Sequence, residues 1–236
     1  MNTFFSSLEI FEELFLLDAD ETIHAIKVMR MTEGESLKVI NGKGIEVIAK
    51  IVSTKGKYCQ LQAQSITQKP KGRNYGLSIA ISPTKNNDRF EWFLEKAIEI
   101  GVDEIIPIYC QNSERFKLNY ERINKQVIAG LKQSNNYFKP EIKEAISFKK
   151  LMELDDNYKG FIAHCKTALK LPLNQVFTNE KMFYRILIGP EGDFTQEEID
   201  FALKTGYQSI SLGQNRLRTE TAGLLACMSP AIIFGT

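Results

Sequence analysis

The first third of the chain alternates apolar and polar positions with the period of a β-strand. Residues 37–39 and 45–51 place apolar side chains at every second position, which predicts two strands that each bury one face. The sequence Asn-Gly-Lys-Gly at 41–44 lies between them and is typical of a hairpin turn. A polar, basic run at 68–74 contains Pro70 and Gly72 and is the best linker candidate in the chain. We therefore expect a β-rich domain over residues 1–72.

Beyond residue 72, short apolar runs alternate with segments of helical period. Asp88 and Glu91 can cap a helix that ends at Gly101, and Thr195 with Glu198 forms a second capping box. Buried strands are expected at 77–81, 105–109, 160–165, 183–188 and 209–212, and further helices at 120–132, 148–154, 195–205 and 219–234. Strands that alternate with helices predict a parallel α/β sheet over residues 73–236.

The overall charge balance hides a partition along the chain. The 236 residues carry 30 lysines and arginines against 29 acidic residues, a formal net charge of +1, whereas a strongly basic chain is the usual mark of a nucleic-acid binder. Residues 1–26 hold six acidic and no basic residues, but 27–73 hold ten basic and three acidic ones. Residues 115–150 hold nine basic and three acidic ones. Local basic patches of this kind can bind RNA phosphates although the net charge is near zero.

Several classes of protein are not indicated by the sequence. The four cysteines are far apart, so neither a zinc site nor a disulfide scaffold is expected, and reduced thiols in or near the core fit a cytoplasmic protein. With only two histidines, a histidine metal centre or a Ser-His-Asp triad is not expected. The acidic N-terminus is unlike a secretory signal, and the apolar stretch at 222–234 is too short to cross a bilayer. The chain lacks the glycine-rich loops of P-loop NTPases and dinucleotide-binding domains.

Two loops near the C-terminus are the best candidates for a functional site. The first, Ile-Gly-Pro-Glu-Gly-Asp-Phe at 188–194, joins an expected buried strand to a well-capped helix. Its two glycines allow a ligand to approach the backbone closely. The second loop, LGQNRLRTETA at 212–222, also joins a strand to a helix. In a parallel α/β sheet, ligands bind at such loops, although a plain strand-to-helix turn is an alternative for each.

The second loop concentrates charged and hydroxyl side chains at the start of the last helix. Thr219 can cap that helix, and Glu220 complements its dipole, so both have a structural explanation. Arg216 and Arg218 do not, because cations are disfavoured near a helix N-terminus. Their placement indicates an anionic or electron-rich partner.

The segments IGPEGDFTQEE and LGQNRLRTETA, in this order, resemble the paired signatures of the SPOUT superfamily. Within it, the chain is similar to the bacterial 16S ribosomal RNA uridine-N3 methyltransferase family. Four shorter segments, at 24–30, 96–102, 113–115 and 133–134, resemble that family in the same order. The similarity therefore extends over nearly the whole chain.

The resemblance implies a fold, a reaction and partners. It implies a small N-terminal PUA-like β-barrel that helps to bind RNA, and a C-terminal SPOUT α/β domain with a deep trefoil knot. The methyl donor would be S-adenosylmethionine, without a metal, and the active form a homodimer. The product would be 3-methyluridine in the decoding region of the small-subunit RNA. The partner would be 16S ribosomal RNA or the assembling small ribosomal subunit.

The resemblance also assigns residues of this sequence to roles. Arg218 would stabilise the negative charge that develops when the uracil N3 loses its proton, with Arg216 as the reserve for this role. Glu220 would orient Arg218 or receive the proton, unless it only complements the helix dipole. Cofactor contacts are expected at His164, Leu187, Ile188, Gly189, Pro190, Glu191, Gly192, Leu212, Gly213, Leu217, Thr221 and Ala222. RNA contacts are expected at Arg30, Arg115, Gln133, Ser134 and Arg216.

Three departures from the family pattern leave other interpretations open. Asp193 stands where the family usually has glycine, and Asn215 where it usually has arginine. Residues 135–140 lack the arginine that the family commonly carries near a proline in this segment. One alternative is a SPOUT methyltransferase that acts on another RNA atom, such as a ribose 2′-hydroxyl. The other is an RNA-binding ribosome assembly factor that has no catalytic activity.

Overall fold

The computed structural model describes residues 1–8, 11–55, 57–154, 157–179 and 181–235. By their internal contacts, the residues divide into two compact units. The first unit comprises Met1–Lys71 and Ile128–Lys139, and the second comprises Gly72–Val127 and Pro140–Thr236. The break after Lys71 lies within the segment expected as a linker. Nothing in the sequence pattern indicated that residues 128–139 join the first unit, and the domain assignment at residue 72 stays a prediction.

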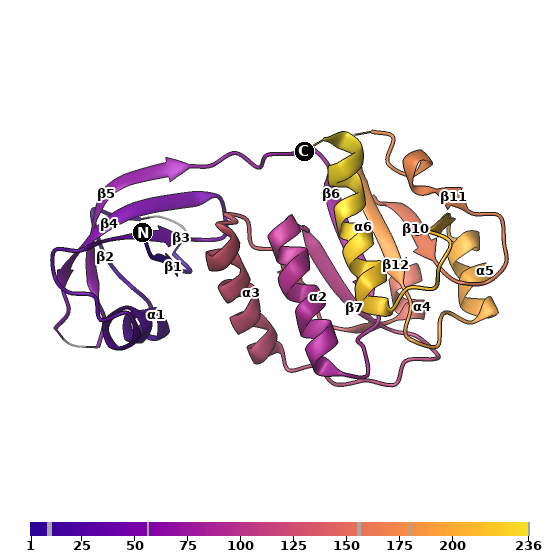
Figure 1. The fold of residues 1–236 in the computed structure, drawn as a ribbon, viewed down its shortest axis with the longest axis horizontal. Helices are drawn as coiled ribbons and strands as arrows, with labels where there is room; N and C mark the ends of the chain where they lie inside the picture. The colour runs from indigo at the N-terminus through magenta and orange to yellow at the C-terminus, as the bar shows by residue number, and fades with distance from the viewer. Residues whose placement is uncertain (9–10, 56, 155–156, 180, 236) are drawn as a thin grey trace. The chain divides into compact units, whose positions relative to one another are not determined.

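The first unit is built on a five-stranded sheet with the strand order β1-β3-β4-β5-β2 (Figure 1). Its strands are β1 (Thr3–Phe5), β2 (Leu14–Leu16), β3 (Ser36–Ile40), β4 (Ile45–Ser53) and β5 (Gln60–Gln68). The antiparallel β3–β4 hairpin was predicted from sequence. The side chain of Asn41 accepts hydrogen bonds from the backbone N–H groups of Lys43 and Ile45, and Gly42 and Gly44 adopt positive φ angles. An asparagine acceptor and glycines with positive φ angles let the chain turn this sharply without steric cost.

A short helical segment completes the first unit and was not expected from the sequence. Helix α1 (Ala19–Ile23) continues into a π-helix (His24–Val28). Arg30, two residues later, has a φ of 56°, a left-handed conformation that few residues other than glycine adopt. The apolar pattern gives no signal for a π-helix, because such turns depend on local insertions rather than on period.

Residues 128–139 belong to the first unit because they contact its helix α1 and its sheet. Helix α3 (Tyr120–Ser134) brings Lys132 within 2.6 Å of Glu21. Further on, the hydroxyl of Tyr137 donates to Glu46 Oε2 at 2.7 Å, and the N–H of Gly44 donates to the Tyr137 carbonyl. Burial alone would raise the pKa of Glu46, but its hydrogen bonds to Tyr137 and two lysines lower that pKa from 4.5 to about 2. This carboxylate is therefore an ionised anchor for the segment.

The second unit contains a parallel sheet with the order β11-β13-β10-β12-β6-β7-β8, as the alternation of strands and helices predicted. Its strands are β6 (Gly76–Ile81), β7 (Glu104–Tyr109), β8 (Glu141–Ile142), β10 (Lys159–Ala163), β11 (Leu171–Pro172), β12 (Phe183–Ile188) and β13 (Gln208–Ser211). A short strand β9 (Ile146–Ser147) pairs with the end of β7. A short 3-10 turn at Leu173–Gln175 follows β11.

Helices cover both faces of this sheet (Figure 1). They are α2 (Asn87–Ile100), α4 (Phe148–Met152), α5 (Gln196–Lys204) and α6 (Thr219–Phe234). Ile81 faces α2 and α6, where any side chain at Gly223 would collide with Ile81 and Phe93. Its neighbour Ala80 lies in the apolar cluster that contains residues of α4 and α5. Since successive strand residues point to opposite faces, the two helix pairs lie on opposite sides of the sheet.

Several local predictions need correction. Asn86, not Asp88, caps α2, and its side-chain oxygen accepts from the Asp88 N–H. The capping box of Thr195 and Glu198 is confirmed. Arg218 occupies the N-cap position of α6, and Thr219 does not cap that helix. Cys165 is exposed, whereas the other three cysteines are buried. Among the helices that the structure describes, none is both long enough and apolar enough to span a membrane.

Candidate functional site

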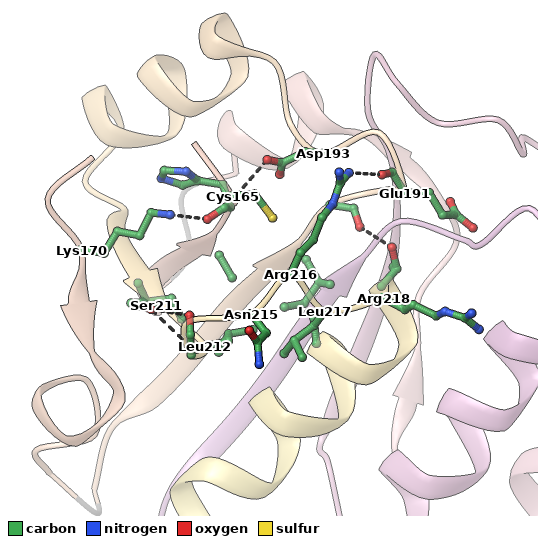
Figure 2. Close-up of a pocket in the computed structure, with 18 of the residues that line it drawn as sticks. Cys165, Lys170, Glu191, Asp193, Ser211, Leu212, Asn215, Arg216, Leu217 and Arg218 are labelled. Carbon is green, nitrogen blue, oxygen red and sulfur yellow. Dashed lines mark hydrogen bonds between the residues drawn. The ribbon is translucent and has the colours of Figure 1, made fainter. Parts of the chain in front are cut away.

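A pocket of about 450 Å³ lies at the carboxyl ends of β10, β12 and β13 (Figure 2). This is the edge where the loops of a parallel α/β sheet meet. Both loops singled out from the sequence line it, together with the loop after β10. The lining residues are Ala163, His164, Cys165, Lys170, Ile188, Gly189, Pro190, Glu191, Asp193, Ile210, Ser211, Leu212, Gly213, Gln214, Asn215, Arg216, Leu217, Arg218, Thr219 and Ala222.

The two signature loops are tied to each other. The hydroxyl of Thr219 donates to the carbonyl of Gly189 at 3.0 Å, and Thr219 is the first residue of α6 and not its N-cap. The guanidinium of Arg216 donates to the carbonyl of Glu191 at 2.9 Å. A side chain at Gly189 would press on the ring and backbone of Phe194. Glycine at this position therefore favours close packing of the loop against Phe194, which lies just before α5.

Asp193 joins the loop after β12 to the loop after β10. Its Oδ2 accepts from the N–H of Cys165 at 2.9 Å, and its Oδ1 accepts from the N–H of Phe194 at 2.9 Å. Its φ is 65°, a left-handed conformation that aspartate tolerates better than most residues. The residue that departs from the family pattern thus keeps the backbone shape of a glycine and adds a carboxylate that holds the loop after β10.

The two arginines of the last loop have different environments. Figure 2 shows Arg216 reaching towards the backbone of Glu191, while Arg218 extends away from it. The Arg218 side chain is exposed and makes no hydrogen bond or ion pair with any residue in the described part of the chain. Its guanidinium is consequently available to a ligand at the mouth of the pocket, whereas one N–H of Arg216 is already engaged.

Three buried polar atoms at or beside the pocket have no hydrogen-bond partner among the described residues: His164 Nδ1, Glu191 Oε2 and Glu220 Oε2. Glu220 is only 7% exposed, and its Oε1 lies 4.0 Å from Arg89 Nε. The Nε2 of His164 is hydrogen-bonded to Ser209 at 2.9 Å. Burial, followed by the charge of Lys170, lowers the pKa of His164 below 6.5, so its ring is neutral at neutral pH. Unpartnered buried groups are costly unless a ligand or an ordered water molecule satisfies them.

The structure separates the expected cofactor residues into two groups. Leu187 lies in the core, and any side chain at Gly192 would meet Asn112 rather than the pocket. Thr221 lies on α6 outside the lining. Glu220, expected as a catalytic residue, also lies on α6 and is not a lining residue. The other expected residues line the pocket: His164, Ile188, Gly189, Pro190, Glu191, Leu212, Gly213, Leu217 and Ala222.

The loop after β10 supplies lining residues that the sequence did not indicate. Cys165 and Lys170 lie there, and the Lys170 ammonium donates to the carbonyl of His164. The segment carries no glycine-rich motif or charge run. The one available signal was its position after a buried strand of a parallel sheet.

The expected RNA contacts are divided between the two units. Arg30, Gln133 and Ser134 belong to the first unit, where the Ser134 hydroxyl donates to the Gly130 carbonyl. Arg115 and Arg216 belong to the second. The Arg115 guanidinium donates to the carbonyls of Lys85 and Lys117, so it holds its own loop in place.

Comparison with known proteins decides the family. A family model described as an RNA methyltransferase domain matches residues 71–229. The chain belongs to the RNA methyltransferase family. A second model, described as an RNA methyltransferase PUA domain, matches residues 17–64. The family resemblance inferred from the two loops is thus confirmed.

Three proteins similar to this RNA methyltransferase match it over almost their whole length. It is 30% identical over 221 residues to the Ribosomal RNA small subunit methyltransferase E of Mesomycoplasma hyopneumoniae, covering 90% of this chain and 92% of that protein. A probable rRNA-methyltransferase from Porphyromonas gingivalis has a similar structure, with a TM-score of 0.89, 34% identity and coverage of 99% and 98% of the two chains. The Ribosomal RNA small subunit methyltransferase E of Neisseria gonorrhoeae bound to S-adenosyl methionine shares the fold, with a TM-score of 0.86, 22% identity and coverage of 99% and 98%.

Proposed function

We propose that this RNA methyltransferase transfers a methyl group from S-adenosylmethionine to N3 of a uridine in 16S ribosomal RNA. The observation that carries the proposal is the pocket of about 450 Å³ between the two signature loops, with an uncommitted arginine at its mouth. The activity named for the relatives above supports the choice of ribosomal RNA as the substrate. The resemblance of the two segments within residues 188–222 to the uridine-N3 methyltransferase family supports the choice of N3.

The residues present fit S-adenosylmethionine. A pocket of this volume lies within the usual range for small-molecule sites, roughly 300–1,000 Å³. Glu191 Oε2 and His164 Nδ1 are buried acceptors or donors without a partner among the described residues. These atoms can hydrogen-bond to the N–H and O–H groups of the adenosine or to the ammonium of S-adenosylmethionine. The backbone of the loops at 189–191 and 212–217 would hold the rest of the molecule by its carbonyl and N–H groups.

No metal is required by this chemistry. When bound, S-adenosylmethionine supplies a methyl group on a positively charged sulfur, which is already activated for transfer. The described residues contain no group of three or more His, Cys, Asp or Glu side chains placed to hold a metal ion. The work of the protein is to orient the methyl group and the uracil and to exclude water.

Arg218 is the residue that we assign to charge stabilisation. Uracil N3 becomes nucleophilic when its proton leaves, and negative charge then spreads over the ring and its carbonyl oxygens. A fixed guanidinium stabilises this charge more in the transition state than in the ground state. Arg218 suits the role because its side chain is exposed beside the pocket and uncommitted among the described residues. Arg216, already bonded to Glu191, suits cofactor-loop positioning better.

Glu220 is the residue that we assign to the proton. Its Oε2 is buried and lacks a partner within the described residues, two positions after Arg218. A buried carboxylate so close to the pocket can accept a proton or orient a neighbouring cation. The distance of 4.0 Å between Arg89 Nε and Glu220 Oε1 leaves the carboxylate only weakly compensated.

The remaining parts of the proposal concern partners and topology. The first unit, with residues 1–72 as its domain, would bind the RNA through its basic residues, and the two signature loops would form a trefoil knot. A homodimer is supported by α6, which exposes Met228, Ile232 and Ile233, because exposed apolar groups on one helix mark an interface. A substrate in the ribosome supports a cytoplasmic location.

Two measurements test the proposed function. Mass spectrometry of nucleosides from ribosomal RNA, with and without the gene, should show 3-methyluridine only when the gene is present. A missing ribose-methylated nucleoside would support action on a 2′-hydroxyl instead. Isothermal titration calorimetry should show that the purified protein binds S-adenosylmethionine. RNA binding without cofactor binding would support a non-catalytic assembly factor.

A further inference from the structure

The loop after β7 displays aromatic side chains at the same edge of the sheet as the pocket. Phe116 is 57% exposed, and its ring lies 5.2 Å from the ring of Tyr109, with an angle of 51° between the planes. Tyr120, four residues later, is also 37% exposed. Large aromatic groups left in water forgo the stabilisation of burial. The exposed ring of Phe116, packed on the half-buried Tyr109 as an aromatic pair, therefore calls for a functional explanation.

The loop is held in one conformation by its own hydrogen bonds. Buried Ser113 accepts from the N–H of Cys110 at 2.9 Å and shares a hydrogen bond with Ser82 at 2.9 Å. Arg115 donates to the carbonyl of Lys117 at 3.1 Å and to that of Lys85 at 3.0 Å. Phe116 lies in the sequence between Arg115 and Lys117, which one of these hydrogen bonds joins. Its exposure is thus built into the loop, and a ligand would meet a preorganised ring.

The same loop is bonded to the segment that forms the pocket. The side chain of Asn112 donates to the carbonyl of Asp193 at 3.0 Å, and the N–H of Gln111 donates to Glu198 at 2.9 Å. The N–H of Lys85, whose carbonyl binds Arg115, donates to Glu191 at 3.0 Å. Glu191 and Asp193 both line the pocket. The aromatic pair and the pocket are consequently supported by one connected set of loops.

The surroundings of the aromatic pair suit a nucleotide. Lys117 directly follows Phe116 and is exposed. Tyr109, but not Phe116, also borders a shallow hollow of about 420 Å³, whose charged lining residues are Lys149, Glu197 and Glu198. Unpaired bases stack on aromatic rings, while nearby cations bind the phosphates.

We propose that Phe116, backed by Tyr109, stacks against an unpaired nucleobase that flanks the target uridine in the RNA substrate. This inference rests on the proposed function and adds a substrate subsite to it. A base to be methylated must leave its stack. Holding a neighbouring base on a fixed ring would keep the RNA in register while the target base enters the pocket.

The chain offers a matched control at the opposite end of the same sheet. Phe183, the first residue of β12, is 55% exposed and lies 6.1 Å from the ring of Tyr158. It resembles Phe116 in residue type, exposure and tyrosine partner. It differs in lying at the amino end of the strands, away from the loops that form the pocket. Phe183→Ala therefore controls for the loss of an exposed phenyl ring as such.

The test compares full-length Phe116→Ala, Phe116→Trp, Phe116→Leu and Phe183→Ala. Binding is measured to 16S ribosomal RNA from a strain that lacks the gene, to an unpaired oligouridine and to a fully paired RNA duplex. We expect Phe116→Ala and Phe116→Leu to weaken binding of the first two RNAs about tenfold, equivalent to about 1.4 kcal/mol. Phe116→Trp and Phe183→Ala should stay within about twofold, and duplex binding should not change.

S-adenosylmethionine affinity, measured by calorimetry, separates this proposal from the proposed function. It should be the same in every variant. If the parent binds no S-adenosylmethionine, the proposed function fails. If the parent binds the cofactor and methylates RNA but Phe116→Ala binds unpaired RNA normally, the stacking subsite is wrong. The stacking proposal would also be overturned by an equal loss of RNA binding in Phe183→Ala or by a loss of cofactor affinity in Phe116→Ala. The same holds if Phe116→Ala weakens binding to assembled subunits but not to free RNA.

Discussion

In the second unit, buried charged groups are paired at the amino end of the parallel sheet, whereas some at its carboxyl end have atoms without a partner among the described residues. At the amino end, Arg185 is 1% exposed, yet its guanidinium lies 3.3 Å from Glu104 Oε1 and 3.9 Å from the ring centre of Tyr158. Ser78 donates to the same Glu104 oxygen at 2.6 Å. Ser78 lies between Arg185 and Glu104 in the strand register. Every polar partner in this row is therefore supplied by the fold.

At the carboxyl end, the fold leaves polar groups unmatched. Within the described residues, the buried Oε2 atoms of Glu191 and Glu220 and the Nδ1 of His164 have no partner, and the side chain of Arg218 is uncommitted. The amino end thus resembles a structural ion pair, and the carboxyl end resembles a site that a ligand completes. Satisfied polar groups indicate stability, whereas unsatisfied ones at a pocket indicate function.

Arg185→Met would remove the buried ion pair at the amino end of the sheet and should have the largest effect on the free energy of unfolding. It removes the buried partner of the Glu104 carboxylate, which typically costs about 3–5 kcal/mol; the partly exposed Lys143, whose ammonium lies 3.6 Å from Glu104 Oε2, offsets part of that cost. Urea unfolding should show this loss. Arg122→Met is the control, because Arg122 pairs with Glu91 at 2.7 Å but is largely exposed and should lose less than about 1 kcal/mol. Equal losses in both variants would contradict the comparison; Glu104→Gln offers a milder version if Arg185→Met does not fold.

Arg218→Ala would test the carboxyl end and should act on turnover instead of stability. Removing one group that stabilises transition-state charge typically lowers kcat about 100- to 1,000-fold. The unfolding free energy and the affinity for S-adenosylmethionine should stay near those of the parent, because the guanidinium has no partner to lose in the described part of the fold. Arg218→Lys retains a cation, so its kcat should lie between that of the parent and that of Arg218→Ala. Methylation of ribosomal RNA at the parent rate by Arg218→Ala would disprove the assignment.

Asp193→Gly would test a residue at the carboxyl end whose polar atoms are matched. The change removes the acceptor for the Cys165 N–H and so frees the loop after β10. We expect roughly tenfold weaker binding of S-adenosylmethionine by calorimetry, from the loss of a hydrogen bond to a charged group. The unfolding free energy should change little, because glycine relieves roughly 1 kcal/mol of left-handed strain.

Asp193→Asn is the matched control for that prediction. Asparagine retains a side-chain acceptor and tolerates the left-handed conformation. Cofactor affinity within about twofold of the parent is therefore expected. If Asp193→Gly also bound the cofactor like the parent, the link between the two loops would have no part in binding.

The pH dependence of His164 should give the smallest effect. Its pKa in the folded protein is lowered below 6.5, mainly by burial and then by Lys170. Between that lowered pKa and 6.5 the unfolded chain binds the extra proton, so stability falls as the pH drops through this window and levels off below it. Urea unfolding of the parent and His164→Gln at several pH values should show the fall only in the parent. A parallel fall in both proteins would assign it to other groups.

Much of the second unit could be predicted from local sequence. Apolar runs and caps located its main strands and helices because these signals act over a few residues; the Thr195–Glu198 capping box is one example. The loops at 188–194 and 212–222 were found by their glycines and arginines. The N-cap of α2 was misplaced by two residues, since Asn86 and Asp88 offer similar oxygens and only the backbone geometry selects one.

The site was recognised only in part, because its third wall comes from a segment without a motif. Cys165 and Lys170 join the pocket because β10 lies between β12 and β13 in the sheet. Strand order depends on packing between distant segments, which a local pattern does not record. The exposed ring of Phe116 is a further case, because alternating polarity gives no information about the side of a loop on which a residue lies.

The sequence by itself determined the β-rich start, the parallel α/β unit, the two signature loops and the RNA methyltransferase family, since each depends on residue types at short, fixed spacings. The tertiary structure alone decided how these parts meet. It joined residues 128–139 to the first unit, bonded Thr219 to Gly189, and left Arg218 uncommitted while Arg216 was engaged. These outcomes depend on hydrogen bonds between residues far apart in the chain, whose partners are chosen by the fold rather than by their neighbours in sequence.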